Sequence, residues 1–233
     1  MNKKNTQLRV LIIYFSLSGQ SRGLINLLAA GIRNQNIFVT IEQIQPRKKI
    51  GFPLGTLWRT VKMMFSTFFR ARIPIQKLSS QCYENYQLII LAGPTWSYNP
   101  SGPILSLLDS EGKALFKDQR VLPLISCRGY HRLHNVLLRI QLKRYGARLE
   151  ESLIFAHPIS EPWSTIGVFL KSAGYRPEQI SLLKSHYSHF GHTTDQLQQV
   201  KRYGNLIGKA LLKNESIDLK SSSAQKLVPG YHR

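Results

Sequence analysis

Two adjoining stretches decide the fold: Arg9-Val-Leu-Ile-Ile-Tyr-Phe15 and Ser16-Leu-Ser-Gly-Gln-Ser21. The first is almost entirely apolar, which is typical of a strand buried on both faces of a parallel sheet. The second is a short polar loop, after which apolar residues recur at helical spacing over residues 24–32. Another apolar run, residues 37–44, follows closely. A strand, loop, helix and strand in this order build a parallel sheet with a right-handed crossover.

The alternation continues along the chain. Apolar runs at 87–92, 121–126 and 151–155 predict three more strands, and residues 103–108, 133–145 and 194–212 predict helices. The pattern predicts an α/β fold with a doubly wound, five-stranded parallel sheet. We expect a single domain over residues 1–213, interrupted by insertions at 47–76 and 158–190, and a polar, disordered tail over 214–233.

The charge of the chain is strongly basic. Its 233 residues carry 32 Lys and Arg against 12 Asp and Glu, a formal net charge of +20, which attracts polyanions. No apolar stretch approaches the roughly 20 residues of a membrane-spanning helix, and two cysteines are too few for a disulfide scaffold. We expect a cytoplasmic protein, with peripheral attachment to the inner membrane face left open.

The loop at residues 16–21 enters the first predicted helix at its N-terminus, where free backbone N–H groups favour a phosphate. Ser16, Ser18 and Ser21 add hydroxyl donors, and Gly19 lets the backbone approach a ligand closely. A serine that caps the helix beside an ordinary turn explains the same residues equally well.

Three motifs resemble those of the flavodoxin-like family. Ser16-x-Ser18-Gly19-x-Ser21 resembles its phosphate loop, and Gly93-Pro-Thr-Trp-Ser-Tyr98 resembles its loop against the flavin ring. The stretch 192–204 is similar to the family's last helix. The resemblance covers roughly residues 8–46, 84–156 and 192–213. It implies a flavodoxin-like fold, with its five strands in the order 2-1-3-4-5, and bound FMN.

The resemblance also implies the residues that hold FMN. They are Ser16, Ser18, Gly19, Gln20 and Ser21 at the phosphate, Pro94, Thr95, Trp96, Ser97 and Tyr98 at the ring, and Cys127, Arg128, Gly129 and Tyr130 in the third loop. The chemistry would belong to the flavin itself. A cation at Arg128 would raise the flavin's two-electron potential, unless the side chain points to solvent. Cys127 is expected to be a small buried residue rather than a nucleophile.

A narrower resemblance involves the flavodoxin-like proteins labelled dialkylresorcinol condensing enzymes. It rests on Tyr14-Phe-Ser-Leu-Ser-Gly-Gln20, on Trp96 with Pro103-Ile104, and on Ser126-Cys127-Arg128. The label implies a condensation, but no Cys/His/Asn arrangement for that chemistry can be recognised in the sequence. We therefore expect the fold and the flavin rather than the condensation.

These observations favour an FMN oxidoreductase that takes hydride from NAD(P)H and reduces a quinone-like or other lipophilic acceptor near a membrane. An alternative resembles the membrane-linked protoporphyrinogen oxidases. An alternative of another class is a basic, non-enzymatic protein that binds nucleic acid or anionic membrane. Nucleic acid is disfavoured because no nucleic-acid-binding motif is recognised, and the loosely spaced His186, His189 and His192 do not predict a metal site.

The first insertion contains an amphipathic helix with a large apolar stripe. Its stripe consists of Leu57, Trp58, Val61, Met64, Phe65, Phe68 and Phe69. Arg59, Lys62 and Arg70 lie off the stripe. Packing against the sheet edge or in a homodimer is the ordinary interpretation. Residues 55–72 would otherwise lie on an anionic membrane, or form a lid over a lipophilic substrate.

Overall fold

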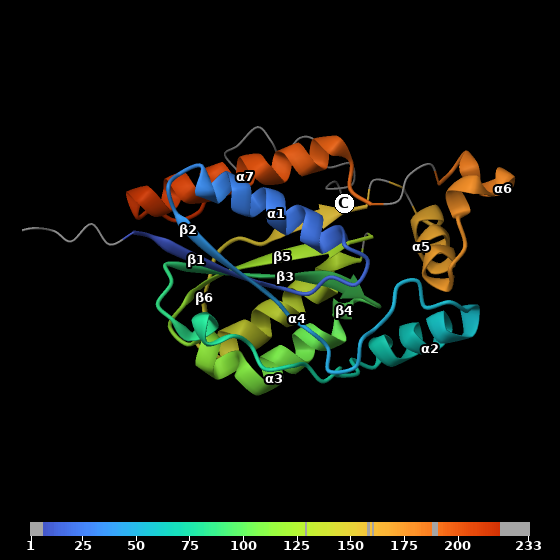
Figure 1. Cartoon of the computed structure of the whole chain (residues 1–233), viewed down its shortest axis with the longest axis horizontal. Helices are drawn as coiled ribbons and strands as arrows, with labels where there is room; N and C mark the ends of the chain where they lie inside the picture. The colour runs from blue at the N-terminus through green and yellow to red at the C-terminus, as the bar shows by residue number, and fades with distance from the viewer. Residues whose placement is uncertain (1–6, 129, 158, 160, 188–190, 220–233) are drawn as a thin grey trace, which may run out of the picture.

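The computed structural model describes residues 7–219, apart from 129, 158, 160 and 188–190. A sheet lies between two layers of helices, with further helices at one end (Figure 1). The elements in chain order are β1 (Arg9–Tyr14), α1 (Gln20–Arg33), β2 (Phe38–Gln43), α2 (Leu57–Phe68), η1 (Ser80–Tyr83), β3 (Leu88–Trp96), β4 (Asn99–Pro100), α3 (Gly102–Phe116), β5 (Arg120–Cys127), α4 (His131–Arg144), β6 (Arg148–Leu149), β7 (Leu153–Ala156), α5 (Trp163–Ala173), η2 (Pro177–Gln179), α6 (Ser181–Lys184) and α7 (Thr194–Lys213). Within this described part, each helix is too short or too polar to cross a membrane.

The sheet has the predicted strand order. β1 pairs in parallel with β2 on one side and with β3 on the other, and β3 pairs in parallel with β5. Two short strands stand at the edge where one was predicted. β6 pairs with the start of β5, and β7 pairs with its end. The order β2-β1-β3-β5, followed by this divided edge strand, confirms the doubly wound arrangement.

Each face of the sheet buries a separate apolar core. Val10 and Ile12 of β1 point toward α1 and α7, whereas Leu11 and Ile13 point toward α3 and α4. Figure 1 shows the two helix pairs on opposite faces of the sheet. All four β1 side chains are fully buried, which explains why the strand is apolar without the alternation of a half-exposed strand.

The packed chain continues past the expected boundary at residue 213. Ile217 and Leu219 are buried, and both pack in the core on the α1 and α7 face. The backbone N–H of Ile217 donates to the Glu150 carboxylate at 3.3 Å. Residues 214–219 are therefore part of the folded domain, and the rest of the expected tail lies outside the described residues.

The two insertions lie at the carboxyl ends of the strands (Figure 1). The first is closed at its base, because Pro46 and Ile75 form an antiparallel bridge. The backbone N–H of Gln76 also donates to the carbonyl of Gln45 at 2.8 Å. The two insertions meet where the Leu54 N–H donates to the Ser172 carbonyl of α5 at 2.6 Å. Segments more than a hundred residues apart in the sequence thus form one cover.

Helices α1 and α7 cross so closely that glycine is required at the crossing. A Cβ at Gly204 would lie 2.2 Å from the Leu28 carbonyl oxygen, and one at Gly31 would lie 2.2 Å from the Lys201 carbonyl oxygen. We expect Gly204→Ala to lower the free energy of unfolding by about 1–3 kcal/mol, because backbone atoms must move apart. Urea denaturation followed by circular dichroism measures the loss.

Gly23→Ala is the matched control. Gly23 lies in α1, as Gly31 does, but a Cβ there would meet no atom within 4 Å. Alanine should therefore leave stability unchanged or raise it by up to about 1 kcal/mol, as expected from helix propensity alone. Equal effects of the two substitutions would show that the helix crossing is looser than described.

Candidate functional site

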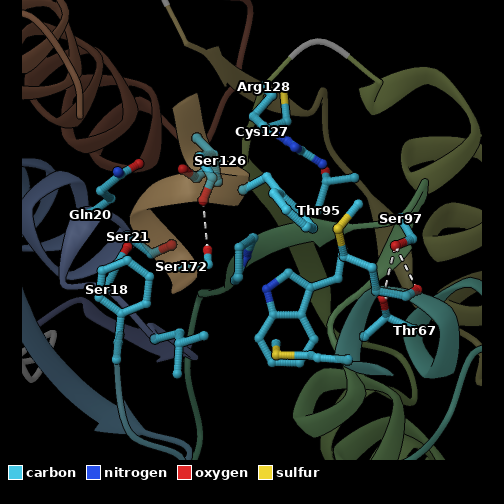
Figure 2. A pocket seen from close by; sticks show the side chains of 18 of the residues that line it. Ser18, Gln20, Ser21, Thr67, Thr95, Ser97, Ser126, Cys127, Arg128 and Ser172 are labelled. Atoms are coloured by element: carbon cyan, nitrogen blue, oxygen red, sulfur yellow. Dashed lines mark hydrogen bonds between the residues drawn. The ribbon is translucent and has the colours of Figure 1, made fainter. Parts of the chain in front are cut away.

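A pocket opens at the carboxyl ends of β1, β3 and β5, and it gathers most of the residues predicted for the site. Those that line it are Ser16, Ser18, Gln20, Ser21, Pro94, Thr95, Trp96, Ser97, Cys127 and Arg128. Figure 2 shows Ser18, Gln20 and Ser21 on one side of the pocket and Ser97 on the other, with Arg128 extending toward Thr95. Three loops far apart in the sequence therefore meet in one place, as expected for an open α/β sheet.

The remaining predicted residues lie elsewhere. Gly19 is the N-cap residue of α1, with a φ of 87° that favours glycine. Tyr98 and Tyr130 line a second, adjoining pocket rather than the first. Their rings are in contact, with centroids 4.8 Å apart. Gly129 lies outside the described residues.

The N-terminus of α1 faces the pocket without a side-chain cap. The Arg22 N–H approaches the Ser16 hydroxyl only at a long 3.4 Å. A Cβ at Gly19 would meet no atom within 4 Å, so the space beside this turn is open. The N-cap residue is thus Gly19 rather than a serine, although Ser16 accepts the Arg22 N–H from one turn back. The other N–H groups of the first turn remain donors that suit an anion.

The segment after β3 is more regular than the loop expected there. β3 continues through Trp96 and pairs with β4 in an antiparallel hairpin. Ser97 and Tyr98 form its turn, both in the left-handed region with φ of 42° and 71°, as a two-residue hairpin requires. The Trp96 ring packs edge-on against Phe15, with centroids 5.5 Å apart. The hairpin thereby fixes one aromatic residue in each pocket.

Helix α2 covers the pocket with its polar side. Thr60 and Thr67 are buried, and the Thr67 and Ser97 hydroxyls lie 2.8 Å apart (Figure 2). The Ser97 hydroxyl donates to the Met64 carbonyl at 3.0 Å. The Asn99 amide donates to the last carbonyls of α2, those of Thr67 at 3.2 Å and Phe68 at 3.3 Å. These hydrogen bonds from Ser97 and Asn99, which we call the α2 contact, hold the helix over the site.

The large apolar stripe of α2 consequently faces outward. Trp58, Phe65 and Phe69 are 74%, 67% and 65% exposed, and Leu57, Val61 and Phe68 are exposed as well. Of the stripe, Met64 alone turns inward and lines the pocket. The expected packing of the stripe against the sheet edge is therefore wrong, whereas packing in a homodimer stays a prediction.

Sequence reasoning missed the residues that the insertions contribute. They are Phe52, Leu54, Thr60, Met63, Met64 and Thr67 from the first insertion, and Val168, Phe169 and Ser172 from the second. The sequence allowed a lid as one role of the first insertion. The large apolar stripe drew attention away from the narrower side of the helix, whose Thr and Met residues line the pocket. No motif marked the second insertion as a partner of the first.

Thr95 is held from behind by a buried histidine. Its hydroxyl lies 2.7 Å from Nδ1 of His134, which is 2% exposed. Burial, helped by the positive charges of Arg70 and His131, lowers the pKa of His134 to about 3. The imidazole is therefore neutral at physiological pH, and it orients Thr95 without adding charge to the pocket.

His157 is a further pocket residue that sequence reasoning did not place there. Its ring stacks on Tyr187 at 5.8 Å between centroids. The Ile159 N–H donates to Nδ1 of His157 at 3.2 Å, so in a neutral ring the proton lies on Nε2. His186 instead stacks on Trp163, and His189 lies outside the described residues.

Arg128 supplies positive charge where the two pockets meet, since its side chain lines both. The ion pairs of the described residues join other groups, and none neutralises Arg128. Burial raises the pKa of the neighbouring Cys127 thiol to about 12, although Arg128 opposes the rise. The pocket thus combines backbone donors, an aromatic wall and an available cation, which suits a planar anionic ligand.

Comparison with known proteins finds similarity in structure alone. No family model matches the chain, and no curated protein is similar to it. A flavoprotein from Lactobacillus acidophilus NCFM, solved in complex with FMN, has a TM-score of 0.51 and 21% identity over 63% of this chain and 93% of its own. A candidate flavoprotein from Bacteroides eggerthii DSM 20697 has a TM-score of 0.50 and 15% identity over 70% and 98%.

An archaeal flavodoxin is also similar, with a TM-score of 0.47 and 13% identity over 88% of this chain and 99% of its own. The narrower resemblance to dialkylresorcinol condensing enzymes stays a prediction from the sequence. At such low identities the similarities concern the fold. Strand order, layers and structural neighbours together show that the chain has the flavodoxin-like fold.

Proposed function

We propose that the pocket binds FMN and that the protein is an FMN-dependent oxidoreductase. The observation that carries the proposal is the meeting of the α1 N-terminus, the Trp96 ring and the Arg128 cation in one pocket. The similar flavoprotein from Lactobacillus acidophilus, which was solved with FMN, supports it. FMN, when bound, supplies hydride and electron transfer.

The residues of the pocket divide the work of holding the cofactor. The loop at 16–21 would bind the phosphate through backbone N–H groups at the start of α1 and through serine hydroxyls. Trp96 and the adjoining β3 backbone would contact the ring, and His134 keeps Thr95 in place. The two insertions would exclude water from above, because Met64 and Phe169 lie on the pocket wall.

The second pocket supports a donor and an acceptor that each present a flat ring. Its walls include four aromatic residues, Phe65, Phe68, Tyr98 and Tyr130. It shares Thr95, Ser97 and Arg128 with the first pocket. A nicotinamide or a quinone has the flat shape that such aromatic walls accept. The proposed reaction takes hydride from NAD(P)H and reduces a lipophilic, quinone-like acceptor near a membrane.

The cofactor assignment predicts that a carboxylate at Ser18 abolishes FMN binding. Ser18→Asp would place a negative charge where the phosphate lies, so we expect the affinity for FMN to fall by at least about a hundredfold. The visible spectrum after incubation with FMN and removal of unbound flavin measures retention. Ser110→Asp, on the exposed side of α3, adds the same charge outside the pocket and should retain FMN.

A wild-type protein that stays colourless in excess FMN would overturn the assignment. Full retention of FMN by the Ser18→Asp variant would instead overturn the placement of the phosphate.

The position of Arg128 predicts its effect on the redox potential. Arg128→Gln removes a positive charge beside the proposed ring site, and we expect the two-electron potential of bound FMN to fall by about 30–60 mV. Arg128→Lys should restore most of the difference because it keeps the charge. Reductive titration against a reference dye measures the potential. An unchanged potential in Arg128→Gln would show that the side chain does not act on the flavin.

A further inference from the structure

The outer side of α2 presents a continuous apolar surface to solvent. We define the aromatic face of α2 as Leu57, Trp58, Val61, Phe65, Phe68 and Phe69, all of which are exposed. Phe69 packs edge-on against both Phe65 and Phe68, with centroids 4.9 and 5.4 Å apart. The three phenylalanine rings therefore form one cluster. A single exposed apolar side chain is ordinary, but a cluster of them indicates an interaction surface.

The aromatic face cannot turn inward to bury itself. The α2 contact fixes the opposite side of the helix, where Ser97 bonds Thr67 and Asn99 bonds the last helical carbonyls. Thr60 is also buried, with its hydroxyl bonded to the Thr56 carbonyl at 3.0 Å. Rotation of α2 would leave Ser97 and Asn99 without these partners, so the fold itself holds the aromatic face outward.

The segment that carries the aromatic face contains only basic charges. Residues 43–83 contain no Asp or Glu. Arg59 and Lys62 on α2 are exposed, as are Arg47, Lys48 and Lys49 at the base of the insertion. Arg47, Lys48, Lys49 and Arg59 line one groove beside the helix. The insertion thus combines exposed aromatic rings with cations that no acid of the same segment neutralises.

We infer that the first insertion docks the protein on an anionic phospholipid surface. The rings of the aromatic face would enter the headgroup and acyl boundary, and the neighbouring cations would contact lipid phosphates. A helix with Trp, Phe and Leu on one side and only Lys and Arg as charges has the composition of an interfacial helix. The cations attract the negative surface, and burial of the rings supplies a part of the affinity that salt does not screen.

Charge also argues against a second copy of this chain as the occupant. A symmetric dimer brings the same surface of both subunits together. Such a contact would bring the basic residues of the two segments, Arg59 and Lys62 among them, into one interface, with no acidic residue of either segment to pair with them. A lipid surface offers the opposite charge instead. Nucleic acid offers that charge as well, but its phosphates give no apolar phase in which six large side chains can be buried.

Docking in this orientation would also present the second pocket to the lipid. Phe65 and Phe68 belong both to the aromatic face and to that pocket, where Tyr98 and Tyr130 complete the wall. A lipophilic acceptor could then pass from the bilayer to the pocket along aromatic side chains. This last step rests on the proposed function, whereas docking itself requires no cofactor.

Co-sedimentation with vesicles tests the inference. The full chain is mixed with vesicles of phosphatidylcholine and phosphatidylglycerol in equal amounts, or of phosphatidylcholine alone. We expect binding to the anionic vesicles that weakens as salt is raised. The variant Trp58→Ser/Phe65→Ser/Phe69→Ser should lose affinity about tenfold or more, because three rings no longer enter the lipid.

The control variant removes three exposed apolar residues elsewhere. Phe38→Ser/Ile140→Ser/Leu212→Ser changes side chains that are 47%, 44% and 56% exposed on β2, α4 and α7. This variant should bind anionic vesicles as the wild type does. Equal circular dichroism spectra and melting temperatures of both variants would exclude unfolding as the cause of a loss.

Three results would overturn the inference. They are the absence of wild-type binding to anionic vesicles, unchanged binding by the α2 variant, and tighter wild-type binding to duplex DNA than to vesicles at equal phosphate concentration. Loss of a wild-type dimer in the α2 variant, without any vesicle binding, would assign the face to a second copy.

The same vesicle assay is run with and without FMN, so that the two proposals fail separately. A protein that sediments with vesicles but never retains FMN would leave docking in place and overturn the cofactor assignment. A protein that retains FMN but does not sediment with vesicles would leave the cofactor assignment in place and overturn docking.

Discussion

The pairing of β1 with both β2 and β3 is the constraint on which the site depends. Strand order reverses at β1, so the connections after β1 and β3 leave on opposite faces of the sheet and open a crevice between them. The crevice brings the loop at 16–21 together with Thr95 and Trp96, although some eighty residues separate the loop from these two in the sequence. The apolar strands secure this geometry, because a shift of β1 would remove Val10 and Ile12 from one core and Leu11 and Ile13 from the other.

The insertions add what the sheet cannot provide, which is a cover. α2 packs with its threonines inward because Ser97 and Asn99 offer hydrogen-bond partners there. The strained turn at Ser97 and Tyr98 therefore has two roles: it anchors the cover and sets the position of an aromatic residue in the second pocket. The cost of the arrangement is an apolar surface left in solvent, which the rest of the chain does not cover within the described residues.

Sequence reasoning reached the fold through local patterns. The buried run at 9–15 and the polar loop after it predict β1 and the turn into α1, and both stand where expected. It failed where long-range hydrogen bonds decide which side of a helix is buried. The stripe of α2 is far more hydrophobic than the side that carries Thr60 and Thr67, yet those threonines face inward. It also missed Ser172 and Leu54, because nothing local shows that the two insertions meet. The predicted roles of the site residues toward FMN stay predictions.

The closed base of the first insertion has a consequence for how a ligand enters. Because Pro46 and Ile75 pair side by side, the chain leaves and rejoins the domain at nearly the same point. The segment could then move away once the bonds from Ser97 and Asn99 and the bond between Leu54 and Ser172 open, while every pairing within the parallel sheet stays intact. Such a subglobal opening would exchange the amide protons of α2 before those of β1 or β3. Access to the crevice is thus separated energetically from the unfolding of the domain.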